Sequence, residues 1–212
     1  MTILPSAYLP SVAWFAGMAA AGNDCVVDLG EHYIKRSERN RTRILAAHGI
    51  MPLTAQVAHA DRPRQPMRTM RLDYSKRWQH QHWGALVASY KASPFFDHYA
   101  VAFAPFFREP GRYDYLADFN MAILECLCSL LGLPVPAVSE RYVEASAGDR
   151  DLRPKGASDA LQTTNGPAFV AEPYIQVFSD RMDFQPNLSI VDLLFAEGPA
   201  SRAVLRRCWR ES

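Results

Sequence analysis

Residues 2–29 read TILPSAYLPSVAWFAGMAAAGNDCVVDL, and this stretch decides the fold. The apolar run Thr2–Tyr8 predicts a strand, and the following proline suits the first turn of a helix over Ser11–Ala21. Cys25–Leu29 is short and rich in β-branched residues, which predicts a second strand. A strand, a helix and a strand in so short a span indicate a βαβ unit. Its parallel strands place the loops that follow them at one edge of the sheet.

Further strands and then helices are expected downstream. Arg43–Ala47 and Met51–Val57 look like a hairpin turned at His48-Gly49, and Met67–Asp73 alternates apolar and basic residues as a half-buried strand does. Helices are expected over Lys76–Lys91, from Pro94 onward, and over Tyr113–Leu131, Leu188–Ala196 and Pro199–Trp209. The sequence therefore predicts an α/β fold. Its mixed sheet of about five to seven strands is built mainly from residues 2–73, and a helical C-terminal half packs against it.

The bulk composition is that of one globular domain. A chain of 212 residues with 49% hydrophobic content fits a single domain over 1–212, with a long loop at about 143–167 whose composition favours mobility. Ile3–Gly22 carries no charge, but its two prolines and polar residues argue against a membrane span. The four cysteines form no CxxC pair. We expect a cytoplasmic monomer or weak dimer without disulfides or bound metal.

The positive charge is concentrated in one segment. Residues 35–77 carry eleven Lys/Arg against three acids, a net of +8, whereas the rest of the chain has a net charge of −7. The densest part, Tyr33–Arg43, follows the second strand directly, where open α/β sheets bind ligands. Lys35, Arg36, Arg39 and Arg41 could bind the phosphate of a small molecule, because arginine suits bidentate contact with phosphate. Alternatively, these residues form a solvated loop that makes salt bridges to the acidic residues in the rest of the chain.

Two residues are candidates for acid–base chemistry. His82 could act as a general base, since its side chain exchanges a proton near neutral pH, but a helical histidine among aromatics can equally be a buried, hydrogen-bonded group. Asp24 precedes the second strand and could hold Lys35 or Arg36 or accept a substrate proton. A role in the turn is the alternative.

Three further residues are candidates for the substrate site. Asn40 could orient an amide or a sugar hydroxyl, or form a turn. Asp192 lies within an apolar run, where a carboxylate is costly unless paired, so we expect an ion pair with one of the clustered arginines. Trp78 could stack on a sugar or base, or belong to the core.

Several catalytic motifs are absent. The sequence has no GxGxxG, GxxxxGK[ST], GxSxG or HExxH pattern, which argues against dinucleotide oxidoreductases, P-loop nucleotidases, α/β-hydrolases and zinc peptidases. The residues do not identify a cofactor.

A set of short motifs carries a family resemblance. They are Pro5 with Tyr8-Leu9-Pro10, Asp24, Tyr33–Ser37 running into Arg39-Asn40-Arg41, Leu53-Thr54, Trp78, His82, Tyr90, Ser93–Phe96 and Phe184–Phe195. In this order they resemble the WbqC-like protein family. The resemblance implies acyl or aminoacyl transfer onto an activated sugar in bacterial surface-polysaccharide or O-antigen synthesis.

The resemblance and the charge together define an expected site. Tyr8, Lys35, Arg36, Arg39, Asn40, Arg41 and His82 should converge on one concave pocket, with Asp24 and Asp192 within pairing distance of its cations. The expected ligand is a phosphate-bearing small molecule such as a nucleotide sugar. The alternative is a non-enzymatic module that binds nucleic acid or an acidic partner through residues 35–77.

Overall fold

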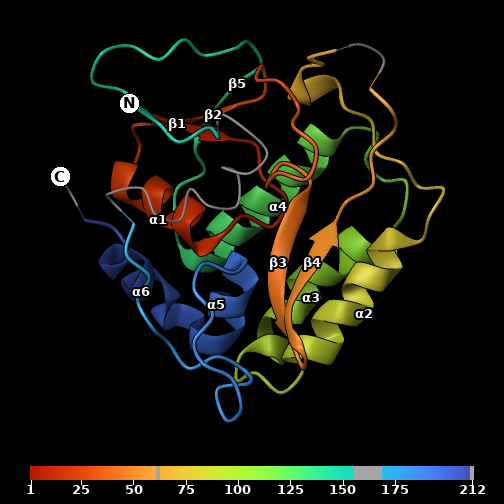
Figure 1. Ribbon diagram of the computed structural model, residues 1–212, viewed down its shortest axis with the longest axis vertical. Helices are drawn as coiled ribbons and strands as arrows, with labels where there is room; N and C mark the ends of the chain where they lie inside the picture. Colours follow the sequence, from red (N-terminus) through yellow and green to blue (C-terminus); the bar gives the residue numbers. More distant parts are fainter. Residues whose placement is uncertain (61–62, 155–168, 211–212) are drawn as a thin grey trace.

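The computed structural model describes residues 1–60, 63–154 and 169–210 and has the expected α/β class (Figure 1). Strand β1 (Thr2–Pro5) pairs in parallel with β2 (Cys25–Asp28), and α1 (Val12–Ala21) connects them. Helix α1 begins where the Ser11 hydroxyl accepts a hydrogen bond from the Trp14 amide. The predicted βαβ unit is therefore confirmed.

Two short strands missed by the sequence analysis complete a four-stranded sheet of order β5-β2-β1-β6. Strand β5 (Ala137–Ser139) pairs in parallel with β2, and β6 (Arg150–Asp151) pairs in parallel with β1. Because every pairing is parallel, the carboxyl ends of all four strands lie at the same edge.

The hairpin forms a separate two-stranded sheet, so the expectation of one sheet fed mainly by residues 2–73 is wrong. Its strands are β3 (Arg41–Ala46) and β4 (Gly49–Thr54). The expected strand over Met67–Asp73 is also wrong, because Met67–Thr69 forms a 3₁₀ helix. Met67 and Met70 are both buried. Three residues apart, they lie on one side of a 3₁₀ turn, whereas a strand would point them to opposite faces.

The C-terminal half is helical, as expected. Its helices are α2 (Trp78–Tyr90), α3 (Phe96–Arg108), α4 (Leu116–Leu131), α5 (Ile190–Glu197) and α6 (Ser201–Arg207), and together with α1 they supply most of the core. In Figure 1 the hairpin lies beside α2 and α3, while α1, α5 and α6 gather on the other side. None of the helices in the described ranges is long and apolar enough to cross a membrane.

The loop after β1 is held in an unusual conformation by distant segments. Leu9 is buried with a φ of 45°, a left-handed conformation that is strained for a leucine. Its carbonyl accepts hydrogen bonds from the hydroxyls of Thr42 at 2.8 Å and Ser189 at 3.0 Å. The Tyr8 amide also donates to the Glu38 carbonyl at 2.8 Å. The motifs near residues 8, 40 and 189 thus meet and fix this loop.

The long loop expected at 143–167 is only partly described. Its first part contains β6, so it is not free of secondary structure. Residues 155–167 lie outside the described residues.

Candidate functional site

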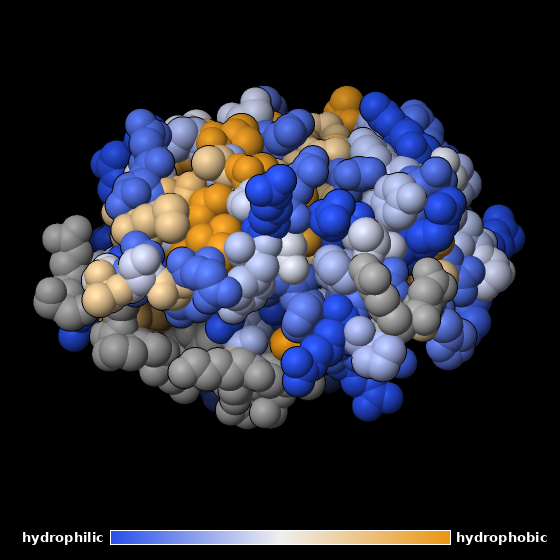
Figure 2. Space-filling view, turned by 90° about the horizontal axis from the view of Figure 1, so that it is seen from above, coloured by the Kyte–Doolittle hydropathy of each residue, from blue (hydrophilic) through white to orange (hydrophobic). Residues whose placement is uncertain are grey.

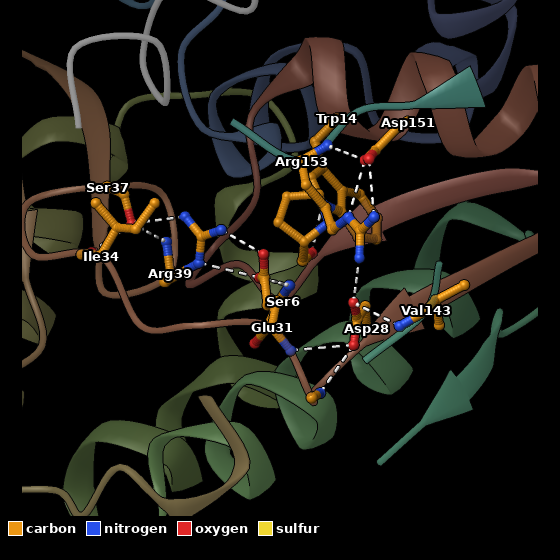
Figure 3. A network of polar contacts seen from close by, with 12 residues as sticks. Ser6, Trp14, Asp28, Glu31, Ile34, Ser37, Arg39, Val143, Asp151 and Arg153 are labelled. Atoms are coloured by element: carbon orange, nitrogen blue, oxygen red, sulfur yellow. Dashed lines mark hydrogen bonds and ion pairs between the residues drawn. The ribbon is translucent and has the colours of Figure 1, made fainter. Parts of the chain in front are cut away.

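The carboxyl edge of the sheet carries two buried ion pairs side by side (Figure 3). In the first, both carboxylate oxygens of Glu31 accept from the Arg39 guanidinium, through Nε at 3.0 Å and through Nη2. The side chains are 3% and 2% exposed. Glu31 also accepts from the Ser6 amide at 3.2 Å, so the pair joins the loops after β1 and β2.

The second pair ties the ends of three strands together. The Asp28 carboxylate binds Arg153 and accepts from the Glu31 amide at 3.1 Å and the Val143 amide at 3.2 Å. The Arg153 guanidinium also binds Asp151 and lies 4.5 Å from the centroid of an exposed tyrosine ring. Arg153 follows β6, and Val143 follows β5. The two pairs together make a closed base beneath this edge, in which each buried carboxylate contacts an arginine.

Burial perturbs Glu31 of this base and the nearby buried acid Glu38. It raises the pKa of Glu31 to about 7, against the opposing effect of Arg39. Burial likewise raises the pKa of Glu38 to about 7, although a hydrogen bond from Ser11 and the charge of Arg43 oppose the shift. A buried acid with this behaviour is typical of a site or of a structural ion network.

Two neighbouring chain segments next to this base carry four exposed cations: Lys35, Arg36, Arg64 and Arg68. We call these four residues the cationic rim. Two loop segments build it, since the Tyr33 amide donates to the Gln65 carbonyl at 2.9 Å and His32 pairs antiparallel with Pro66. No member of the rim forms an ion pair with another residue of the described ranges. The rim therefore carries positive charge that none of the described residues neutralises through an ion pair.

Two members of the rim have strained backbones. Arg36 and Arg64 have φ angles of 60° and 54°, in the left-handed region that disfavours residues with a Cβ atom. Such strain persists where the surroundings impose it, and it is frequent at binding sites.

His82 and Tyr8 lie in the core and not on the rim. The Tyr8 hydroxyl and His82 Nδ1 are 2.8 Å apart, and Trp78 and Phe119 pack around them. Burial lowers the pKa of His82 to about 4, so the ring is neutral at pH 7. This arrangement favours a structural role for both residues: His82 is a hydrogen-bonded core histidine, and Trp78 is a core tryptophan.

Neither acid expected near the cations pairs with them. Asp24 is exposed and lies at the amino edge of the sheet, 3.1 Å from the N-terminal ammonium. Asp192 is buried and accepts from the hydroxyls of Tyr90 at 2.8 Å and Tyr174 at 2.6 Å and from the Gln176 amide at 2.9 Å. Burial raises its pKa. The expected ion pair between Asp192 and a clustered arginine is wrong, because these neutral donors satisfy the carboxylate.

The remaining candidates divide between the fold and the surface. Arg41 is half-buried and donates to the Thr54 hydroxyl at 2.9 Å across the hairpin. The Asn40 side chain donates to the Ala55 carbonyl at 3.1 Å and is buried. Of the seven residues expected to share one pocket, only Lys35 and Arg36 thus belong to the rim.

Several residues of the edge were not anticipated. Asn120 is buried and donates to the Ser6 hydroxyl at 3.1 Å and the Arg39 carbonyl at 2.8 Å. A polar residue within the apolar stripe of its helix was the available signal. Arg153 had none, because β6 is too short to predict. Within the described residues, no group of three or more His, Cys, Asp or Glu side chains could hold a metal ion.

Comparison with known proteins identifies the family. Residues 6–173 match the WbqC-like protein family. The chain belongs to this family. It is also 28% identical over 229 residues to "Uncharacterized protein Rv1507c" of Mycobacterium tuberculosis, an alignment that covers 98% of each chain. No solved structure matches the chain. The motifs of this WbqC-like protein near residues 8, 40 and 189 are those that fix the loop after β1.

Proposed function

We propose that this WbqC-like protein transfers an acyl or aminoacyl group onto an activated sugar during bacterial surface-polysaccharide synthesis. In this proposal the cationic rim binds the phosphate of the sugar. The chemical class comes from the family resemblance, and the position of the site comes from the rim.

One observation carries the proposal: the rim has four exposed cations without ion-pair partners among the described residues, at the edge where parallel sheets bind ligands. Like charges on neighbouring segments repel one another, and an anion bound by them relieves that repulsion. Arginine and lysine both bind phosphate, arginine through two parallel hydrogen bonds.

The buried base gives the rim a fixed shape. Glu31 and Arg39 satisfy each other, so Arg39 has no charge to offer a ligand. Its role is to anchor the segment from which Lys35 and Arg36 project. We assign no proton transfer to His82 or Asp24, because neither lies at this edge.

A thermal-shift titration tests the proposal. A UDP-linked amino sugar should raise the melting temperature, because a ligand that binds only the native state stabilises it, and the unphosphorylated sugar should not. The Lys35→Ala/Arg36→Ala variant should lose most of this shift. The control Arg202→Ala removes an exposed cation from α6, at the opposite end of the molecule in Figure 1, and should retain the shift.

An RNA-binding assay on the same protein distinguishes the alternative function from the transferase. A module that binds nucleic acid through phosphates should bind single-stranded RNA of any sequence, with an affinity that falls steeply between two salt concentrations. Tight RNA binding of this kind, with no response to the nucleotide sugar, would replace the transferase proposal.

A further inference from the structure

One aromatic side chain differs from all the others in its exposure. Tyr142 is 52% exposed, and within the described ranges it is the one Phe, Tyr or Trp residue that is more exposed than buried. It follows β5, and the amide of the next residue, Val143, donates to the Asp28 carboxylate at 3.2 Å. Because Asp28 ends β2, Tyr142 lies at the carboxyl edge of the sheet, next to the buried base.

Close packing fixes the backbone of Tyr142 beside the cationic rim. A Cβ atom on Gly30 would lie 2.1 Å from the Tyr142 backbone nitrogen, so only glycine allows this approach. The carbonyl of the preceding residue, Leu29, accepts from the Arg68 amide at 3.0 Å. Through these two contacts the backbone nitrogens of Tyr142 and Arg68 lie within about 10 Å of each other. Tyr142 is therefore a neighbour of the rim.

A buried arginine covers one face of the Tyr142 ring. The guanidinium carbon of Arg153 lies 4.5 Å from the ring centroid, and the arginine side chain is only 6% exposed. Ion pairs with Asp28 and Asp151 hold this guanidinium in place (Figure 3). Since one face of the ring meets a fixed cation, the exposed area of the side chain lies mainly on the opposite face and the ring edge.

A ring held in this way is a preformed stacking platform. Every nucleobase has a flat face that stacks on an aromatic side chain. Little entropy is lost when such a ligand binds, because Arg153 and the packed backbone already order the ring. The sequence offered Trp78 for stacking, but Trp78 is 2% exposed. Tyr142 is the residue that the structure leaves accessible for this role.

We propose that Tyr142 stacks on the base of a nucleoside diphosphate whose phosphates bind the cationic rim. The inference rests on the proposed function for the rim's affinity for phosphate. It adds that the activated sugar carries a nucleotide and not another phosphate-bearing group. The ribose separates base from phosphates, which suits a ring and a rim that are adjacent but distinct. Because stacking accepts any base, Tyr142 determines that a nucleotide binds and not which one.

A single strand of nucleic acid fits this arrangement less well. Proteins that bind single strands stack successive bases on aromatic side chains along a basic groove. The segments that follow β2 and β5 meet near the top of Figure 1, and Figure 2 views this end from above and shows a largely hydrophilic face. Among the described residues Tyr142 is the one largely exposed ring, which provides for one base. We therefore assign it to a mononucleotide.

Calorimetric titrations of UDP and of inorganic pyrophosphate test the role of Tyr142. Tyr142→Ser should lower the affinity for UDP at least about fivefold, the lower limit for one base stacked on an aromatic side chain. The affinity for pyrophosphate should stay unchanged, because pyrophosphate has no base. Tyr142→Phe retains the ring and should bind both ligands as the wild type does.

Two further variants exclude a general effect on the fold. Tyr142→Leu keeps an apolar contact with Arg153 but has no flat face, so it should lose affinity for UDP as Tyr142→Ser does. Val101→Ser removes another exposed apolar side chain, since Val101 is 76% exposed on α3. It should bind UDP as the wild type does.

The outcomes separate this inference from the proposed function. Equal affinity of the wild type and Tyr142→Ser for UDP would overturn the inference, while loss of pyrophosphate binding in Lys35→Ala/Arg36→Ala would leave the proposed function standing. UDP affinity that depends on Tyr142 but not on Lys35 and Arg36 would support the stacking and contradict the proposed function.

Three other results would also overturn the stacking. The first is no binding of UDP at all, including the case in which single-stranded RNA binds instead. The second is a loss of pyrophosphate affinity in Tyr142→Ser equal to its loss of UDP affinity, which would assign the side chain to the phosphates. The third is a loss of affinity for an amino sugar 1-phosphate with UDP affinity unchanged, which would assign the ring to the sugar.

Discussion

The basic segment divides into two halves with opposite roles. Arg39 is buried and neutralised by Glu31, whereas Lys35 and Arg36, only a few residues earlier, are exposed and lack ion-pair partners among the described residues. Arginines that look alike in the sequence therefore act differently. The buried half fixes the loops after β1 and β2, and the exposed half carries the charge available to a ligand. Burial, and not charge, separates the structural residues from those that we propose to bind a ligand.

The largest effect should come from the buried pair. Arg39→Ala leaves Glu31 as an uncompensated buried acid, so we expect the free energy of unfolding to fall by about 3–5 kcal/mol. Urea denaturation followed by circular dichroism measures this. Arg36→Ala, which removes an exposed cation, should change the same quantity by less than about 0.5 kcal/mol. Similar losses in both variants would show that the two halves are not distinct.

A smaller effect is expected at His82. Replacing it with glutamine disturbs its hydrogen bond with the Tyr8 hydroxyl, at a cost of about 1–3 kcal/mol in the free energy of unfolding. Ligand-induced stabilisation should stay intact, because the ring lies in the core. A normal melting temperature with a lost ligand response would instead place His82 in the binding site.

The same residue makes stability depend on pH in a defined direction. Burial lowers the pKa of His82 from 6.5 to about 4 in the folded chain, so the unfolded chain takes up the proton first. The contribution of neutral His82 is complete above pH 6.5 and is lost as the pH falls toward 4. His82→Gln should remove this component from the pH dependence of unfolding. An unchanged pH profile in the variant would contradict the buried, neutral ring.

The sequence predicted the fold better than the site, and particular residues show why. The βαβ unit follows from local patterns, since Ser11 caps α1 and β-branched residues fill β2. Strands β5 and β6 have only three and two residues, too few for an alternation of apolar and polar residues to be recognised. Their absence from the prediction hid Arg153 and with it the second ion pair.

The site was harder to predict because exposure depends on contacts between distant segments. Lys35 and Arg39 are both basic, and only the position of Glu31 after β2 decides that Arg39 is neutralised. Arg64 and Arg68 join the rim through backbone pairing with residues 29–33, which no local pattern announces. Asp192 illustrates the same limit, because its hydrogen-bond donors come from residues 90, 174 and 176.

The smallest effect concerns the strained backbone of the rim. Arg36→Gly should be more stable than Arg36→Ala by about 1 kcal/mol, because glycine adopts a φ of 60° without the cost that alanine pays. Both variants should lose the same binding of phosphate. Equal stability of the two, measured by urea denaturation, would show that this conformation is not imposed by the fold.

The most direct test of the division between the halves is a calorimetric titration of the UDP-linked amino sugar into three proteins of equal folded stability. These are the wild type, Arg36→Lys and Lys35→Ala/Arg36→Ala. We expect Arg36→Lys to bind within a few-fold of the wild type and the double variant to lose at least about tenfold in affinity, since a hydrogen bond to a charged group contributes about 1.5 kcal/mol or more. Unchanged affinity in the double variant would contradict the assignment of the exposed cations as the phosphate site.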